Sequence, residues 1–224
     1  LAKYNLRDSK ILLGIEKAKG YHTSDIHTAS LGNRFNNYYN ISTKVEGALL
    51  REANKRGYHY KTLSRADKSF YAGGYVKQPI KGLFENVATI DFNSQYPSII
   101  KTYNISHDTK IDITNGKKDL PKDYINTPVA KEAGCIFLKS RVGIIPEILD
   151  ELHKARMIHE NLRDKQKYGS GKFWYHYWQI VSRKMMILSF YGELGNNKGR
   201  FYDLQLAKSI TLSGRFYSKF AQKY

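Results

Sequence analysis

The sequence predicts an α+β fold, in which a few strands of a partial sheet are followed by a helical hairpin and one further helix. Two short apolar runs, residues 86–92 and 135–138, indicate the strands. The hairpin is indicated by apolar residues that recur at helical spacing after Pro146, until Gly169 interrupts them. A chain of 224 residues is long enough for one ordinary domain or two small ones.

Two helices and two irregular segments are expected before the first strand. The first helix covers 8–20, where Asp8 can cap the start and Gly20 can end it. The second helix opens at a capping box, Thr43-x-x-Glu46, and ends near Gly57. Polar composition and glycines predict irregular structure over 21–41 and 58–82.

The strand over 86–92 is expected to lead through a turn into a helix that has Pro97 in its first turn. The rest of the chain predicts the following elements: a tight turn at Asn115-Gly116, a strand at 135–138, a helix from Pro146, a helix over 173–188 and a last helix from Asp203 to about Lys223.

The amino-acid composition limits the binding partners and the kind of protein that can be expected. The net charge of +17, from 37 Lys and Arg against 20 Asp and Glu, favours a polyanionic partner, either nucleic acid or an anionic membrane surface. A basic protein without such a partner is the alternative. The single cysteine, Cys135, excludes a disulfide framework and is expected in the core. No apolar run is long enough to span a membrane and no signal peptide is visible, so we expect a cytoplasmic location. The chain lacks an initiator Met and is expected to be a piece of something larger.

The string from Asp91 to Ile100 contains the first candidate site. An aspartate at the end of a strand suits a hard cation, and the backbone N–H groups of Ser94 and Gln95, near a helix start, suit phosphate oxygens. Tyr96 would stand beside them as a rigid aromatic plate, whereas the plain alternative for Asp91 is a turn cap. The string resembles motif A of family B DNA polymerases, D-x-x-S-L-Y-P-S-I-I, with Gln95 in place of Leu. The resemblance implies that Asp91 holds the catalytic Mg²⁺ ions and that Tyr96 underlies the sugar of the incoming dNTP and excludes a 2′-hydroxyl.

A second segment, from Lys184 to Gly192, places a lysine two helical turns before a Tyr-Gly pair that we expect to break the helix. A solvated lysine and a core tyrosine are the plain alternative. The segment resembles motif B, K-x-x-x-N-S-x-Y-G, which implies that Lys184 binds the triphosphate and that Tyr191 with Gly192 packs on the new base pair. Leu188 replaces the family's Asn and removes a hydrogen-bonding amide.

Three further segments also resemble the family. Arg156 matches an arginine that reaches the triphosphate, but Glu160 stands where the family has Lys, so we expect Glu160 to turn away or Lys165 or Lys154 to take that role. An exposed helix charge is the alternative for Arg156. The loop with Tyr71, Gly73 and Gly74 resembles the Y-x-G-G loop that contacts DNA, since glycine lets backbone approach phosphate closely. Tyr4-x-x-x-Asp8 resembles an exonuclease motif and makes Asp8 a remnant metal ligand.

The order of these segments implies a piece of a phage or viral type polymerase. Residues 1–20 would end the exonuclease domain, 21–82 would connect, 83–145 would form the palm, 146–192 the fingers helices, and 193–224 a return to the palm. The second catalytic carboxylate, in motif C, and the thumb are absent, so a complementary chain is expected to pair with an exposed sheet edge. We therefore expect no polymerase activity from this chain alone on primer–template DNA with dNTPs. A non-catalytic basic DNA-binding module is the alternative.

Overall fold

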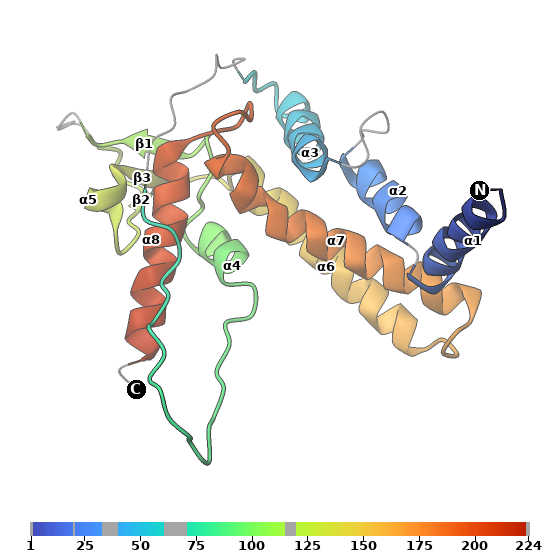
Figure 1. Cartoon of the computed structure of the whole chain (residues 1–224). Helices are drawn as coiled ribbons and strands as arrows, with labels where there is room; N and C mark the ends of the chain where they lie inside the picture. The colour runs from blue at the N-terminus through green and yellow to red at the C-terminus, as the bar shows by residue number, and fades with distance from the viewer. Residues whose placement is uncertain (1, 20, 33–39, 61–70, 115–119, 223–224) are drawn as a thin grey trace. The chain divides into compact units, whose positions relative to one another are not determined.

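The computed structural model describes residues 2–19, 21–32, 40–60, 71–114 and 120–222 (Figure 1). It consists of helices and one small sheet, and the chain divides into two compact units. The first unit comprises Leu1–Arg51 and Glu151–Ser189, and the second comprises Glu52–Asp150 and Phe190–Tyr224. Within the described residues, every helix is too short or too polar to cross a bilayer.

The second unit contains a three-stranded antiparallel sheet in the order β1-β3-β2. The central strand β3 (Cys135–Leu138) pairs with β1 (Lys110–Asp112) on one side and with β2 (Tyr124–Ile125) on the other. Ile111 lies opposite Ile136 in this register. Residues 135–137 are almost completely buried, so the predicted strand and the buried position of Cys135 are both confirmed.

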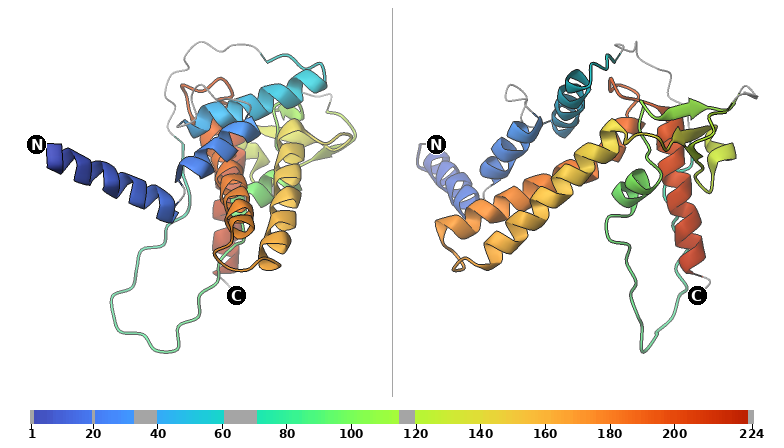
Figure 2. Two further views of the ribbon diagram at one scale, coloured as in Figure 1. Left: turned by 90° about the vertical axis from the view of Figure 1, so that its right-hand side faces the viewer. Right: turned by 180° about the vertical axis from the view of Figure 1, so that it is seen from behind.

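Helix α8 (Leu204–Ala221) packs against β3, against the short helix α5 (Ala130–Ala133) and against α4 (Gln95–Thr102), as both views show (Figures 1 and 2). The Asp203 carboxylate begins α8 as expected, because its Oδ1 accepts hydrogen bonds from the backbone N–H groups of Gln205 (3.0 Å) and Leu206 (3.1 Å). It also forms an ion pair with Lys110 of β1. The start of α8 is thereby attached to the sheet.

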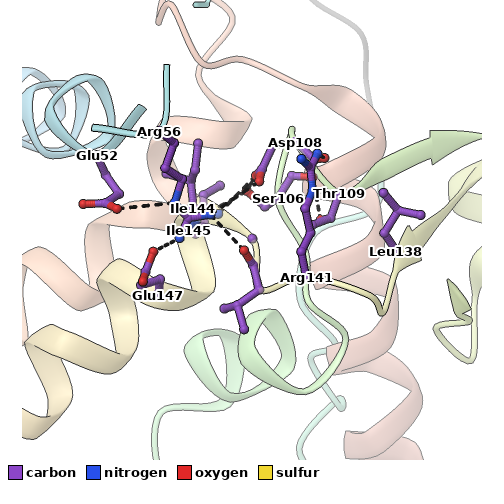
Figure 3. A network of polar contacts seen from close by, with 12 residues as sticks. Glu52, Arg56, Ser106, Asp108, Thr109, Leu138, Arg141, Ile144, Ile145 and Glu147 are labelled. Atoms are coloured by element: carbon purple, nitrogen blue, oxygen red, sulfur yellow. Dashed lines mark hydrogen bonds and ion pairs between the residues drawn. The ribbon is translucent and has the colours of Figure 1, made fainter. Parts of the chain in front are cut away.

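Residues just after α4 cap the start of α6 (Ile144–Asp164), about 40 positions further along the chain (Figure 3). Asn104 Oδ1 accepts from Gly143 N at 2.8 Å, Asp108 Oδ1 from Ile144 N at 3.1 Å, and Ser106 Oγ from Ile145 N at 3.3 Å. These three bonds satisfy N–H groups that have no partner inside the helix. The segment 104–108 therefore holds the first turn of α6.

Arg56 links this capping segment to its surroundings (Figure 3). Its guanidinium forms ion pairs with Glu52, Asp108 and Glu147, and Nη1 donates to the Val142 carbonyl at 2.8 Å. The Asp108 side chain is only 3 % exposed, so its charge is held by buried donors rather than by water. The start of α6 thus rests on a charge network in which Asp108 and Glu52 are buried and Arg56 is partly exposed.

The first unit is helical. It contains α1 (Ala2–Lys19), α2 (Tyr21–Gly32), most of α3 (Ile41–Lys55), and the antiparallel hairpin of α6 and α7 (Gly171–Gly195) that the sequence predicts, turning at Gly169–Gly171 (Figure 2). Ser182 Oγ of α7 donates to the Ser24 carbonyl of α2 at 2.9 Å. His159 and His176 join the two arms of the hairpin through their Nδ1 atoms, 2.9 Å apart.

Several local predictions are wrong. Residues 21–32 are helical rather than irregular. Thr28 Oγ1 donates to the Ser24 carbonyl one turn earlier, Ser182 Oγ of α7 donates to the same carbonyl, and Ser24 and Thr28 are buried there. Helix α1 begins at Ala2, so Asp8 lies inside it and cannot cap it. Helix α3 begins at Ile41, where the Asn40 side chain accepts from Ser42 N at 3.0 Å in place of the expected Thr43 box.

Two further predictions differ from the structure. Residues 86–92 form no strand, because no described segment lies alongside to complete a ladder of hydrogen bonds. Helix α7 does not break at Tyr191-Gly192 but continues to Gly195, because Phe190 and Leu194 extend its buried face. The loop over 58–82 is confirmed for 58–60 and 71–82, and the Asn115-Gly116 turn lies outside the described residues.

Candidate functional site

Helix α4 carries the second half of the Asp91–Ile100 string and is fixed on α8. Gln95, the departure from the family pattern, donates from Nε2 to the Gly214 carbonyl (3.2 Å) and to Ser218 Oγ (3.1 Å). Ser94 precedes the helix in the left-handed region, with φ of 54°, and makes no side-chain cap. The backbone N–H groups of the first turn of α4, those of Gln95 and its neighbours, lack the helical partners that later residues have.

Tyr96 of α4 meets tyrosines from two other parts of the chain. Its ring lies 4.7 Å from that of Tyr191, centroid to centroid, at an interplanar angle of 55°. Tyr71 Oη and Tyr191 Oη are 3.1 Å apart and share a hydrogen bond across 120 positions of sequence. We call Tyr71, Tyr96 and Tyr191 the tyrosine cluster. It brings together residues that the sequence analysis predicted as site residues in three separate motifs.

The phenols of Tyr96 and Tyr191 stay protonated at neutral pH. Burial raises the pKa of Tyr191, and its hydrogen bond with Tyr71 raises it further. Burial also raises the pKa of Tyr96, and the neighbouring Tyr71 adds to the rise, while Arg215 opposes it. Neutral hydroxyl groups can both donate and accept hydrogen bonds, and the ring faces remain apolar.

Glycines let the backbone approach the cluster closely. A Cβ at Gly74 would lie 3.2 Å from Tyr96 Oη, one at Gly214 would lie 2.9 Å from Tyr96 Cε1, and one at Gly195 would lie 2.6 Å from Tyr71 Oη. Gly192, by contrast, has open space where its Cβ would be. The surroundings of the rings are therefore shaped by the absence of side chains at three positions.

Arg215 of α8 holds the glycine loop beside the cluster. Its Nη1 lies 3.4 Å from the Gly73 carbonyl oxygen and 3.3 Å from that of Gly74. The next residue, Tyr75, has its ring 6.0 Å from the Arg215 guanidinium and 5.6 Å from Lys219 Nζ. The loop with Tyr71, Gly73 and Gly74 is thus placed next to Tyr96 by a helix that the sequence reasoning assigned no role at this site.

Asp91 is exposed, and its side chain makes no hydrogen bond or ion pair within the described part of the chain. Among the described residues there is also no group of three or more His, Cys, Asp or Glu side chains arranged to hold a metal. A magnesium pair needs carboxylates on both sides. Asp91 by itself does not fit such a pair, and the same is true of the exposed Asp8 on α1.

The remaining nominated residues lie in the first unit. Lys184 is exposed on α7, and Leu188, one turn further, is 50 % exposed. Arg156 of α6 forms an ion pair with Glu160, with Nε 2.8 Å from Oε1. An acid four residues after an arginine on a helix lies directly beside it, and Glu160 is held by Arg156 in this way. That Glu160 turns away from a bound phosphate, or that Lys165 or Lys154 takes the role, stays a prediction.

Two contributions were missed by the sequence reasoning. Gly214 and Ser218 accept hydrogen bonds from Gln95, and Arg215 donates to the Gly73 carbonyl, only because α8 packs on α4. The one signal in the sequence was a glycine inside a helix, which indicates that another part of the chain comes close at that position. The capping role of Asn104, Ser106 and Asp108 depends on contacts about 40 residues away, although their polar spacing before β1 was visible.

Comparison with known proteins shows which family these motifs belong to. The model of DNA polymerase family B matches residues 34–222. The DNA polymerase of Thermococcus sp. (strain 9oN-7) is 34 % identical over 97 % of this chain, and that of Pyrococcus glycovorans is 32 % identical over 100 % of it. A solved family B DNA polymerase from the hyperthermophilic archaeon Pyrobaculum calidifontis superimposes with a TM-score of 0.75 at 26 % identity, over 94 % of this chain.

The chain spans 28 % of the length of each of these three proteins. All three come from archaea and give no support to the expected viral source. The resemblance drawn from the motifs themselves is confirmed, since the matched region includes every nominated residue except Asp8.

Proposed function

Because the chain belongs to DNA polymerase family B, we propose that it is the part of a DNA-directed DNA polymerase that holds the incoming dNTP and the primer–template beside Asp91. The observation that carries this proposal is the convergence of Tyr71, Tyr96 and Tyr191 with the Gly73–Gly74 loop. Three motifs that are far apart in sequence meet at one place, which is expected if they contact one ligand.

Each member of the site has a proposed task. The flat ring of Tyr96 lies under the sugar of the dNTP and leaves no room for a 2′-hydroxyl, and Gly214 sets the position of that ring. Tyr191 packs on the new base pair with Gly192, which leaves open space on one side. The Tyr71 loop, held by Arg215, offers backbone to the DNA.

The triphosphate is assigned to positive groups. Lys184 is exposed and makes no ion pair within the described residues, so it is available to phosphate. Arg156 is paired with Glu160 and would have to share its guanidinium with the ligand. The first N–H groups of α4, from Ser94 and Gln95, add donors near the dipole of a helix start.

The proposed reaction is phosphoryl transfer to a primer 3′ end with two Mg²⁺ ions, in which Asp91 supplies one carboxylate. The described residues do not complete that metal site. We propose that a complementary segment, with motif C and the thumb, covers residues 76–92 as the neighbouring part of the palm. Val76, Leu83 and Ile90 are 82 %, 95 % and 85 % exposed, an apolar surface that a partner strand would bury.

The domain assignment follows the same proposal. The α6–α7 hairpin within 146–192 corresponds to the fingers, and the sheet with α4 and α8 corresponds to the palm, within 83–145 and 193–224. Residues 1–20 are assigned to the end of an exonuclease domain and 21–82 to the connection. A cytoplasmic location stays a prediction.

The decisive experiment is Asp91→Ala in the polymerase reconstituted with its complementary segment. We expect loss of primer extension with unchanged binding of primer–template duplex, because the carboxylate acts on the reaction rather than on the DNA. Asp123→Ala removes the same charge from another exposed site of the second unit and should leave extension intact. Normal extension by the Asp91 variant overturns the proposal.

The chain by itself provides a second measurement. With Mg²⁺, dNTPs and a primer–template, the isolated chain is expected to bind DNA without extending the primer. Extension by the pure chain would contradict the need for a complementary segment. A non-catalytic DNA-binding module, to which Leu188 and Glu160 point, predicts instead that the reconstituted complex is inactive with Asp91 in place.

A further inference from the structure

The turn of the α6–α7 hairpin carries a concentration of aromatic side chains. Six Phe, Trp and Tyr residues lie within eleven positions, 168–178. Five of these, including both tryptophans of the protein and leaving out Tyr175, form one group of ring contacts. We call them the aromatic tip: Tyr168, Phe173, Trp174, Tyr177 and Trp178. None of these residues belongs to a motif that the proposed function uses.

The rings of the aromatic tip order one another. Trp174 and Trp178 are nearly parallel, at 22° with centroids 6.4 Å apart, and so are Phe173 and Tyr177, at 14° and 6.5 Å. Tyr168, which is 77 % exposed, meets Phe173 edge to face at 5.0 Å. Trp174, Tyr177 and Trp178 are half-buried, so each keeps part of its ring accessible to solvent.

Within the described residues, these rings make no ring contact with α2 or α6. Tyr175 turns toward α2 and α6, where its ring meets those of His27 (5.8 Å) and His159 (6.2 Å). Gln179 and Ser182 make the hydrogen bonds to α2. In the part of the chain that the structure describes, each ring contact of the aromatic tip joins two of its own five members.

Helix geometry links the aromatic tip to the rest of α7. Steps of three and four residues from Leu188 lead through Lys184 and Val181 to Trp178, Tyr177 and Trp174. Lys184, Met185 and Leu188 are exposed at the other end of this row. One face of α7 therefore runs unburied from the proposed triphosphate lysine to the aromatic tip.

Positive charge dominates the segment of the aromatic tip, and the adjacent Asp164 is paired with Arg163. Between residues 165 and 192 there are five Lys and Arg and no Asp or Glu. Lys165, Lys167 and Lys172 are exposed, and no carboxylate of the described residues pairs with them. Such a surface attracts a flexible polyanion, whereas an acidic or purely apolar protein segment would use only half of it.

We propose that the aromatic tip and its three lysines bind single-stranded nucleic acid. Bases stack on the accessible faces of Trp174, Trp178 and Tyr168, while the lysines contact the phosphates between them. Stacking of this kind tolerates any base, as a polymerase that meets unpaired template of every sequence would require. The contact is additional to the tyrosine cluster and involves none of its residues.

Tryptophan fluorescence tests this proposal directly, because both tryptophans belong to the aromatic tip. We expect a twelve-residue oligothymidylate, added to the full chain at low salt, to quench the emission in a saturable way. An abasic oligomer of the same length carries the phosphates without bases and should quench little and bind more weakly. Equal quenching by both oligomers, or none by oligothymidylate, overturns the proposal.

Variants separate stacking from charge. Trp178→Leu should weaken oligothymidylate binding roughly tenfold to a hundredfold, measured by anisotropy of a labelled oligomer. Lys167→Gln with Lys172→Gln should reduce the dependence of the affinity on salt. Phe216→Leu removes an aromatic side chain of α8 that is 45 % exposed and serves as the matched control, with affinity unchanged.

The outcomes also distinguish this proposal from the proposed function. If the tip variants bind oligothymidylate normally while Asp91→Ala abolishes extension, the chain is a polymerase part whose tip has no role in binding. If a protein partner, and no oligonucleotide, alters the tryptophan emission, the aromatic tip is a protein interface and the inference is wrong. Loss of oligothymidylate binding in Trp178→Leu supports it whether or not extension is observed.

Discussion

The two halves of the Asp91–Ile100 region differ sharply although they adjoin. Ile90 is 85 % exposed and lies in a segment without regular structure, whereas Ile100, ten residues later, is 1 % exposed in α4. Asp91 makes no hydrogen bond or ion pair with the described residues, while Gln95 makes two hydrogen bonds to α8. The half proposed to carry the metal ligand is therefore not held in place by contacts with other described residues. The half proposed to carry the nucleotide contact is fixed on α8.

The difference shows that a helix and a strand depend in different ways on the rest of the fold. A helix satisfies its backbone internally, so α4 forms and then gains its position from α8 through Gln95 and the core around Ile100. A strand has no internal hydrogen bonds and exists only beside another strand. The segment 86–92 has the composition of a strand and lacks the neighbour.

The largest effect is expected from a matched pair of substitutions. Ile100→Ala should lower the free energy of unfolding by about 2–5 kcal/mol, because it leaves a cavity in the core. Ile90→Ala should change it by less than about 0.5 kcal/mol, because that side chain is already in water. Urea unfolding of both variants measures the contrast, and a similar loss in both would show that 86–92 is packed after all.

A glycine pair sharpens the role of α8. Gly214→Ala should cost about 1 kcal/mol, because the new Cβ meets the Tyr96 ring at 2.9 Å and the overpacking outweighs the gain in helix propensity. Gly14→Ala in α1 meets nothing within 4 Å and should stabilise by about 0.5–1 kcal/mol. Thermal unfolding gives both values, and the near-ultraviolet circular dichroism should change only for Gly214→Ala. Stabilisation by Gly214→Ala would mean that Tyr96 is not held against α8.

The departure from the family pattern at Gln95 is expected to matter less. Gln95→Leu restores the family residue but leaves Ser218 Oγ and the Gly214 carbonyl without this donor, and should cost about 1 kcal/mol. Ser218→Ala in the same background should then cost little more, since its partner is already gone. A double-mutant cycle in urea measures the coupling. Additive effects would show that the two side chains do not interact.

The smallest effect concerns alkaline pH. Burial, with the hydrogen bond to Tyr217, raises the pKa of Tyr103 to about 12 from 10.0. The folded chain therefore keeps a proton that the unfolded chain loses, so this contribution to stability is complete below pH 10 and disappears as the pH rises to about 12. Tyr103→Phe should flatten the fall of the unfolding free energy across that interval. An unchanged slope would show that the Tyr103–Tyr217 contact does not hold α4.

Much of the secondary structure could be predicted from the sequence. The strand at 135–138, the hairpin with its turn at Gly169–Gly171, and α8 with its Asp203 cap all follow from short-range rules of periodicity and capping. Helix α2 was missed because the burial of its polar residues Ser24 and Thr28 depends on packing against α7, where Ser182 Oγ donates to the Ser24 carbonyl. The strand at 86–92 was wrongly expected because composition does not report whether a neighbour exists.

The sequence by itself determined the family, through ordered motifs whose residue types suit phosphate, sugar and base. Only the tertiary structure decided that Tyr71, Tyr96 and Tyr191 meet, that Arg215 holds the glycine loop, and that α6 is capped from residues 104–108. The physical reason is range. Helix periods and caps act over a few residues, whereas these contacts join positions 36 to 142 apart and arise only when distant parts of the chain have packed.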